Sequence, residues 1–238
     1  MSDAPVLSVV IPVRNEAEAI PALAAEVHTA LAGAGLTWEA LWVDDGSTDT
    51  TRQHLVALPL PHRALILDRN YGKSAAIIAG LHSARGTWIA TLDGDGQDDP
   101  ADLPGLLNHA QAHGIDLVQG RRIHRRDTWW RRFCSSSANT LRRQILHDGI
   151  HDIGCGTRVG RRNHLVLLPS FTGMHRFLPS LVRAQGGTVA ELPVNHRPRH
   201  GGTSKYGTHD RLWCGLYDLL CVRWVCARSL PIPALVNP

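Results

Sequence analysis

Short apolar runs alternate with stretches of helical periodicity along about the first 120 residues of the chain. Continuous apolar runs of this length are typical of strands that are buried on both faces of a parallel sheet. The predicted strands are residues 6–11, 38–43, 64–67, 88–92 and 116–119. The predicted helices are residues 17–33, 74–83 and 102–113, with a further one that begins after Asp49. This alternation predicts an α/β fold with a parallel sheet and helical crossovers.

Polar side chains occupy the point where each predicted strand ends. They are Asn15 and Glu16, Asp44 and Asp45, Asn70 and Lys73, Asp93 with Asp95 and Gln97, and Arg122. Ligands bind at the carboxyl ends of the strands in such sheets, so a series of polar strand ends favours a binding site over ordinary loop polarity. The first strand is not followed by G-x-G-x-x-G, and the sequence contains no Walker A motif. Both facts argue against an NAD-binding or P-loop protein.

The stretch 87–100 carries the sharpest chemical signal. It begins as an apolar strand and ends in two carboxylates, Asp93 and Asp95, which offer hard oxygen ligands to a Mg²⁺ or Mn²⁺ ion carrying a diphosphate. Asp102 is predicted to cap the following helix. A solvated acidic turn is the plain alternative for an isolated Asp-x-Asp pair. An EF-hand loop counted from Asp93 is excluded, because its sixth and twelfth positions lack the required Gly and Glu.

The second half of the chain is less regular. Helices are predicted at about 128–147 and 174–185, and a strand at 188–194. A tight turn at 152–158 is predicted to lead into a short strand. The basic, glycine-rich segment 197–207 is interpreted either as a mobile loop that wraps a phosphate or as an ordinary surface loop.

The segment 212–227 is strongly apolar but is interrupted by Asp218 and Arg223. At about 16 residues it is too short to span a bilayer, which takes about 20. Its tryptophans and tyrosine, flanked by arginines, suit the lipid–water interface. Apolar residues on nearly all helix faces favour that interpretation over the alternative, a core helix packed on the sheet.

Composition limits the class of protein. A chain of 238 residues with 43% hydrophobic residues supports at least one full α/β domain. The net charge is +4, and arginines cluster in the second half, which suits phosphate groups of a nucleotide, a lipid or a nucleic acid. The 5 cysteines form no C-x-x-C pair, so we expect reduced thiols in a cytosolic protein. Neither a signal peptide nor a run of transmembrane length is expected. The histidine pairs His147/His151 and His196/His200 are interpreted as surface residues rather than zinc ligands.

Three motifs in order resemble family 2 glycosyltransferases with the GT-A fold. They are residues 7–16 (LSVVIPVRNE), 43–49 (VDDGSTD) and 93–100 (DGDGQDDP). Further segments narrow the resemblance to the polyprenyl-phosphate branch, which includes dolichol-phosphate mannosyltransferases and bacterial undecaprenyl-phosphate sugar transferases. These segments are 70–73, 120–122, 152–156 and 199–205. The resemblance covers nearly the whole chain.

The resemblance implies a three-layer α/β/α GT-A fold with a mostly parallel central sheet. It implies a catalytic domain at 1–210, divided into a nucleotide-sugar half, 1–122, and an acceptor half, 123–210, with a mobile basic loop at 197–209. Residues 211–238 would form an amphipathic tail that binds the membrane interface or a partner. The implied activity is inverting transfer of a sugar from GDP-mannose or a UDP-sugar to dolichyl or undecaprenyl phosphate, with Mg²⁺ or Mn²⁺.

The resemblance also implies roles by position. The donor-binding residues would be Pro12, Arg14, Glu16, Val43, Asp45, Lys73, Asp93, Gly94, Asp95, Arg199, Ser204 and Lys205. The metal ligands would be Asp95 and Gln97, and the acceptor phosphate would contact Arg122, Arg132 and Ser135. The catalytic residues would be Asp93, Asp95, Arg122 and Asp152. The role of Asp152 stays open between base, site organiser and turn-former, because an anionic phosphate acceptor needs no strong base.

The sequence departs from the family pattern in two places. Ser136 stands where family members often carry an arginine beside the serine aligned with Ser135. Many bacterial relatives continue into transmembrane helices, whereas this sequence ends at Pro238. We therefore expect a peripheral protein on the cytoplasmic face of the membrane, reached through 211–228 or an integral-membrane partner.

Three alternatives compete with this interpretation. One is a family 2 transferase that acts on a glycan or another non-lipid acceptor. Another is a basic protein that binds nucleic acid or phosphate, which an aromatic content of 5% and the lack of a nucleic-acid motif disfavour. The third is an inactive scaffold, which the intact acidic motif disfavours.

Overall fold

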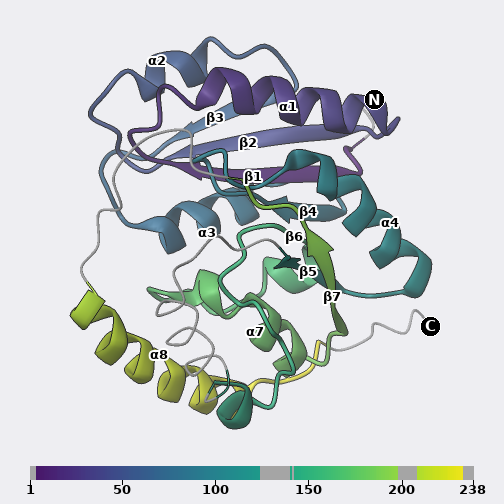
Figure 1. The fold of residues 1–238 in the computed structure, drawn as a ribbon, viewed down its shortest axis with the longest axis vertical. Helices are drawn as coiled ribbons and strands as arrows, with labels where there is room; N and C mark the ends of the chain where they lie inside the picture. Colours follow the sequence, from purple (N-terminus) through teal and green to yellow (C-terminus); the bar gives the residue numbers. More distant parts are fainter. Residues whose placement is uncertain (1–3, 124–139, 141, 198–207, 233–238) are drawn as a thin grey trace, which may run out of the picture.

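A seven-stranded sheet forms the centre of the protein (Figure 1). The computed structural model describes residues 4–123, 140, 142–197 and 208–232. The strands are β1 (Leu7–Val13), β2 (Trp38–Asp44), β3 (His62–Ile66), β4 (Trp88–Thr91), β5 (Leu117–Arg122), β6 (Arg158–Arg161) and β7 (Val189–Val194). Their order is β3-β2-β1-β4-β6-β5-β7, and only β6 runs antiparallel to its neighbours within this described sheet. The predicted mostly parallel α/β sheet is confirmed.

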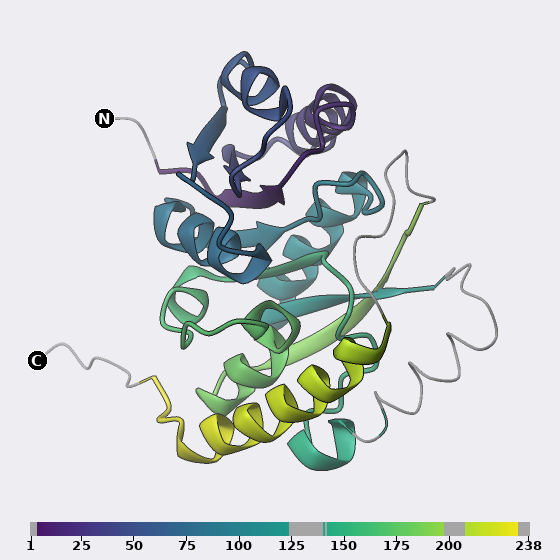
Figure 2. The same ribbon diagram turned by 90° about the vertical axis from the view of Figure 1, so that its left-hand side faces the viewer.

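Helices cover both faces of the sheet. They are α1 (Ile20–Gly33), α2 (Thr51–Val56), α3 (Lys73–Ser83), α4 (Leu103–His113), α6 (Arg162–Leu165), α7 (Leu178–Ala184) and α8 (Thr208–Arg228), with 3₁₀ helices η1 (Pro100–Asp102) and η2 (Met174–Arg176). One face packs against α1, α2 and α4, and the other against α3, α6, α7 and α8. Figure 2 shows α8 beside α7, on the outside of the second layer. The architecture is therefore the expected three-layer α/β/α arrangement.

Strand β1 illustrates why the apolar runs become central strands. Side chains alternate between the faces of a strand. Val9 and Ile11 accordingly enter the core beneath α1 and α4, while Val10 enters the core beneath α3. All three are fully buried. A strand with helices on both sides needs apolar residues at every position, which is what the continuous run supplies.

The prediction that Asp102 caps α4 is wrong. The carboxylate of Asp102 instead accepts hydrogen bonds from the backbone N–H of Asn195 (2.7 Å) and from its Nδ2 (3.1 Å). Asp99 provides the local cap, because its Oδ1 accepts from the N–H of Ala101 at the start of η1. Asp102 thus joins the start of α4 to the end of β7, a long-range contact that no local pattern indicates.

Part of the predicted second half lies outside the described residues. Within the predicted helix 128–147, residue 140 and residues 142–146 are described and are helical. The predicted helix 174–185 is formed by η2 followed by α7. The predicted turn at 152–158 leads into β6 as expected.

Helix α8 has one face in the core and one face exposed. Leu219 and Val222 are buried against the second core cluster. Tyr217, Leu220 and Trp224 are exposed by 71%, 57% and 62%. The helix therefore does pack on the protein, as the less favoured alternative expected, while it presents an apolar stripe outward. Among the described helices none is both long and apolar enough to cross a membrane.

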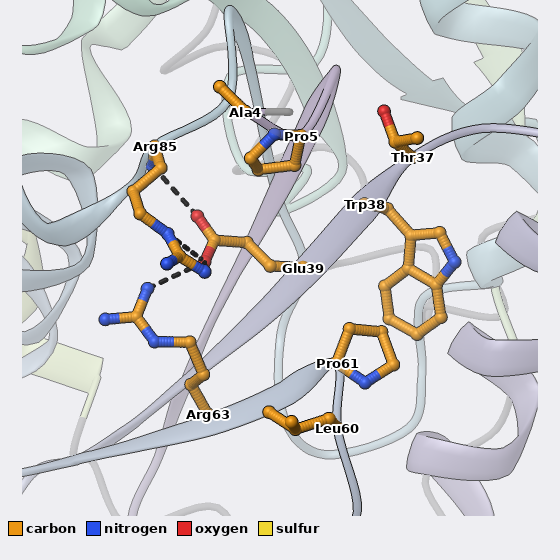
Figure 3. Close-up of a pocket in the computed structure, with 9 residues that line it drawn as sticks. All are labelled: Ala4, Pro5, Thr37, Trp38, Glu39, Leu60, Pro61, Arg63 and Arg85. Atoms are coloured by element: carbon orange, nitrogen blue, oxygen red, sulfur yellow. Dashed lines mark hydrogen bonds and ion pairs between the residues drawn. The ribbon is translucent and has the colours of Figure 1, made fainter. Parts of the chain in front are cut away.

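A buried carboxylate holds the sheet together at the edge opposite the polar strand ends. Glu39 of β2 is 2% exposed and accepts hydrogen bonds from Ser8 Oγ (2.8 Å), Arg63 Nη1 (2.7 Å) and Arg85 Nη2 (2.7 Å) (Figure 3). Burial raises the pKa of Glu39, but the hydrogen bonds from Arg85, Ser8 and Arg63 outweigh it and hold the pKa below the usual 4.5. These contacts lie beside a cavity of about 370 Å³ and connect β1, β2, β3 and the end of α3.

We expect Glu39→Gln to lower the free energy of unfolding at pH 7 by about 2 kcal/mol, because charge-assisted hydrogen bonds are lost. A depressed folded-state pKa contributes stability that is complete above the unfolded pKa and is lost as the pH falls through the folded pKa. The difference between wild type and variant should therefore shrink below about pH 4.5. Urea unfolding from pH 7 to pH 3 measures this. Glu18→Gln, at an exposed position, is the control, and an equal effect of both variants would contradict the assignment.

A second stability prediction concerns Gly80 of α3, which packs directly on the sheet. A Cβ at this position would lie 2.3 Å from Val10 Cγ1 and 3.2 Å from Val43 Cγ2. We expect Gly80→Ala to destabilise the protein by about 1–3 kcal/mol through overpacking, despite the better helix propensity of alanine. Gly105→Ala in α4 is the matched control, because a Cβ there meets no atom within 4 Å. It should stabilise the protein by up to about 1 kcal/mol in the same unfolding assay.

Candidate functional site

A cavity of about 510 Å³ lies at the carboxyl ends of the central strands. Its polar lining residues are Lys73, Asp93, Gln97, Arg122, Arg158, His175, Arg176 and Thr91. The first four were predicted from the sequence, and they come from the start of α3, the segment after β4 and the end of β5. The structure therefore brings together residues that are up to 49 positions apart in the chain, as strand ends in one sheet edge should be.

The carboxylate of Asp93 is the acidic group of this cavity. Its Oδ1 lies 2.6 Å from Lys73 Nζ, and its backbone N–H donates to Asp98 Oδ2 (3.1 Å). Burial raises the pKa of Asp93, but Lys73 outweighs it, with smaller help from Arg158, and the pKa is held below its ordinary value. Asp93 and Lys73 thus form an ion pair at the start of α3.

Asp95 and Gln97 offer the oxygen atoms for a divalent cation. Asp95 Oδ1 accepts from the N–H of Gln97 (3.2 Å), and Gln97 Nε2 donates to the carbonyl of Arg197 (3.4 Å). Because the amide nitrogen of Gln97 is the donor, its amide oxygen is the atom that could ligate a cation. No group of three or more His, Cys, Asp or Glu side chains within the described ranges could hold a metal ion. A pair of hard oxygen donors nevertheless fits Mg²⁺ or Mn²⁺, since Mg²⁺ is usually held by one or two protein groups together with substrate phosphates and water.

The ends of β1 and β2 form the adjoining part of the edge. Asp45, 5% exposed, accepts from the N–H groups of Tyr71 (2.7 Å) and Gly72 (3.0 Å) in the loop before α3. Asn15 accepts from the N–H of Thr48 (2.8 Å). The predicted donor-binding residues on these two strand ends are therefore neighbours: Pro12, Arg14, Glu16, Val43 and Asp45.

Gly94 has a packing reason to be a glycine. A Cβ there would lie 2.8 Å from the carbonyl oxygen of Pro12 and 2.4 Å from Val13 Cγ1. The acidic segment after β4 can therefore lie against the end of β1 only with glycine at this position. The donor-binding role of Gly94 stays a prediction beside this structural one.

Arg122 is held by Asp152 in a bidentate ion pair. Arg122 Nε and Nη2 each lie 2.8 Å from a carboxylate oxygen of Asp152, and the backbone N–H of Arg122 donates to Oδ2 (3.2 Å). Asp152 is 5% exposed, and its own N–H donates to Glu191 Oε1 (3.0 Å). Burial lowers the pKa of Arg122, but the hydrogen bonds and charge of Asp152 outweigh it and raise the pKa above its ordinary value. Of the three roles left open for Asp152, this geometry favours the site organiser.

Three titratable lining residues were missed by the sequence analysis: Arg158, His175 and Arg176. Arg158 is 4% exposed, and its Nη1 donates to the carbonyl of His175 (2.7 Å) while Nη2 donates to that of Cys155. Burial, together with the charges of Lys73, Arg158 and Arg176, lowers the pKa of His175 to about 3. Arg158 could have been suspected, because it directly follows the glycine-rich turn, but no signal marks His175.

Five predicted site residues lie outside the described residues: Arg132, Ser135, Arg199, Ser204 and Lys205. The described residues just before position 198 are firmly attached to the acidic segment. Arg197 pairs with Glu26 (2.8 Å) and Asp99 (2.8 Å), and its N–H donates to the carbonyl of Gln97 (2.8 Å). The basic segment therefore begins next to the proposed metal ligands.

Solved structures with the same fold include one with a bound uridine nucleotide and metal. The chain superimposes on glucosyl-3-phosphoglycerate synthase from Mycobacterium tuberculosis in complex with Mn²⁺, UDP and phosphoglyceric acid, with a TM-score of 0.71, 19% identity and coverage of 94% of this chain and 79% of that one. Mannosyl-3-phosphoglycerate synthase from Rubrobacter xylanophilus superimposes with a TM-score of 0.71 at 19% identity, and the match covers 98% of this chain and 79% of that one. At this identity the likeness establishes the GT-A fold and nothing more.

Closer relatives come from comparison of sequences. Dodecaprenyl-phosphate galacturonate synthase of Rhizobium johnstonii is 36% identical over 223 residues, covering 91% of this chain and 66% of the relative. Undecaprenyl-phosphate 4-deoxy-4-formamido-L-arabinose transferase of Pectobacterium carotovorum is 35% identical over 233 residues, covering 96% of this chain and 69% of the relative. The chain spans about two thirds of the length of these two relatives.

The family profile covers most of the elements that line the cavity, except η2. Residues 8–167 match glycosyl transferase family 2, a range that runs from β1 through the acidic segment and Arg122 to β6 and α6. Motifs, fold and relatives agree, and the chain belongs to glycosyl transferase family 2.

Proposed function

We propose that this protein transfers a sugar from a nucleotide-diphosphate sugar to a polyprenyl phosphate, with Mg²⁺ or Mn²⁺. The observation that carries the proposal is the cavity in which Asp93 and Gln97 of the acidic segment face Arg122 and its partner Asp152. The side with Asp93 and Gln97 suits a metal-bound diphosphate, and the side with Arg122 suits the phosphate of the acceptor. The two sequence relatives, both named as polyprenyl-phosphate sugar transferases, support the same substrate class.

The lining residues have different roles in the proposed reaction. When bound, the metal neutralises charge that develops on the diphosphate leaving group. Lys73 adds a positive charge on the same side, and Arg158 lines the same cavity. Arg122, oriented by Asp152, binds the acceptor phosphate and aims an anionic oxygen at C1 of the sugar. Because that oxygen is already a nucleophile near neutral pH, no side chain has to remove a proton from it, and attack opposite the leaving group inverts C1.

A second candidate acceptor is a small, non-lipid phosphate compound. The Mycobacterium tuberculosis protein of the same fold is named glucosyl-3-phosphoglycerate synthase and was solved with phosphoglyceric acid. The side of the cavity with Arg122 would suit either phosphate. An assay that offers undecaprenyl phosphate and 3-phosphoglycerate side by side separates the two, and sugar transfer to 3-phosphoglycerate alone would overturn the lipid assignment.

The exposed stripe of α8 supports a further part of the proposal, binding to a membrane surface. Tyr217, Leu220 and Trp224 lie at i, i+3 and i+7 and form one outward face. The guanidinium of Arg228 lies 5.3 Å from the ring centroid of Trp224, so a cation accompanies the aromatic group. Aromatic residues beside arginine are typical of the lipid–water interface, where a polyprenyl phosphate presents its head group. An integral-membrane partner is the other occupant that this stripe would suit.

We expect Asp95→Ala to abolish metal-dependent donor binding and turnover while the fold is retained. A thermal-shift screen of UDP-glucose, GDP-mannose and UDP-galacturonate with and without Mn²⁺ identifies the donor. At 100-fold excess over Kd a ligand that binds only the folded state adds about 2.7 kcal/mol of stability. This increment should disappear in the variant. Asp68→Ala, at an exposed position after β3, should keep it, and full activity of Asp95→Ala would exclude the metal role.

We expect the triple variant Tyr217→Glu, Leu220→Glu, Trp224→Glu to lose binding to anionic liposomes. Charges on the exposed stripe remove apolar insertion and repel anionic lipid, while the buried face with Leu219 and Val222 is untouched. Co-sedimentation with phosphatidylglycerol-containing vesicles measures the effect. Val56→Glu, at a position on α2 that is 68% exposed, should not change it. Equal sedimentation of all three proteins would contradict the interfacial role.

A further inference from the structure

His175 reaches the cavity from η2, and none of the roles assigned above uses it. Two other elements, α3 and β6, fix its position. Its Nδ1 lies 2.8 Å from Ser74 Oγ on α3, and its carbonyl accepts from Arg158 Nη1 of β6 (2.7 Å). Its neighbour Gly173 donates its N–H to the same Ser74 Oγ (2.9 Å). A side chain held in this way has one orientation, which is what a ligand contact requires.

The hydrogen bonds allow the tautomer in which Nε2 carries the proton. Ser74 Oγ accepts from the N–H of Gly173 and can direct its own hydroxyl hydrogen at His175 Nδ1, although its second lone pair could accept from Nδ1–H in the other tautomer. With Nδ1 as the acceptor, the proton of the neutral ring resides on Nε2. Among the residues that the structure describes, no hydrogen-bond partner lies at Nε2, so this nitrogen is the one left for a ligand in the cavity that His175 lines.

Burial and the surrounding charges both favour the neutral ring. Burial is the largest cause of the lowered pKa of His175, and Lys73, Arg158 and Arg176 add repulsion. The cavity is thus lined by several cations and by a neutral imidazole. Phosphate oxygens are matched by the cations, whereas a neutral N–H suits a neutral oxygen atom.

We propose that His175 Nε2–H donates a hydrogen bond to an oxygen of the sugar that is transferred, and so helps to select that sugar. The inference rests on the proposed function. In a direct transfer the sugar must lie between the leaving diphosphate, beside Lys73 and Asp93, and the acceptor phosphate, beside Arg122. His175 lines the same cavity as all three residues. A half-buried donor that is satisfied only by the correct sugar discriminates against sugars that lack an oxygen there.

The test compares a nucleotide sugar with the corresponding nucleoside diphosphate in Mn²⁺, by isothermal titration of the full chain. The pairs are UDP-glucose with UDP, UDP-galacturonate with UDP, and GDP-mannose with GDP. His175→Asn keeps an acceptor for Ser74 but removes the Nε2 donor. We expect it to bind the nucleotide sugar about tenfold more weakly and the nucleoside diphosphate unchanged, as befits one buried hydrogen bond. His175→Gln, whose amide N–H reaches the Nε2 position, should recover part of the loss.

The possible outcomes separate this inference from the proposed function. Equal weakening for both ligands would show that His175 supports the cavity only structurally, and no weakening for either would exclude the contact. A wild-type protein that binds no nucleotide sugar would instead overturn the proposed function. His113→Asn, at an exposed position on α4, is the matched control and should bind both ligands as wild type does.

Discussion

The close approach of the turn before β6 to the end of β4 is the contact on which the candidate site depends. Thr91 Oγ1 donates to the carbonyl of Gly156 (2.6 Å). A Cβ on Gly156 would lie 2.4 Å from Asp93 Oδ1 and 2.8 Å from Asp98 Oδ2. Any side chain at position 156 would therefore push the acidic segment away. With glycine there, the turn before Arg158 packs directly against the acidic segment that is proposed to bind the donor.

This contact brings charged groups close together, so their charges must balance. Asp98 and Asp152 are buried and Asp93 is half-buried, while Arg158 is buried without a carboxylate in hydrogen-bonding contact among the described residues. All three carboxylates nonetheless favour the charged form of Arg158 through space. Burying a lone charge is costly, and a nearby charge of opposite sign offsets that cost. The arrangement is thus built before any substrate arrives, which is the condition for electrostatic catalysis.

The sequence was enough to predict those parts of the fold and the site that a local pattern of residues determines. Strand ends could be predicted because each apolar run stops at a polar group, and a parallel sheet collects these ends at one edge. Asp102 was assigned to a helix cap because only its local partners could be considered, whereas its real partner, Asn195, follows 93 positions later. Arg158 and His175 were missed for the same reason. An antiparallel strand inserted between β4 and β5 and a short 3₁₀ helix leave no periodic signal, so only the folded chain shows that they face Asp93.

Helix α8 packs on the core, as one of its two interpretations expected, while binding of its exposed stripe to a membrane stays a prediction. The charge that interrupts its apolar run, Asp218, is explained by a partner in the cavity wall: Arg176 Nη2 donates to Asp218 Oδ2 at 2.9 Å. The residue before it, Tyr217, belongs to the exposed stripe. One turn of helix therefore connects an outward apolar surface to the lining of the site. Under the proposed function this proximity has a physical reason, because a polyprenyl phosphate combines a long apolar chain with a charged head group. A protein that binds both ends of such a molecule needs an apolar surface within reach of its cations, and α8 with Arg176 provides both.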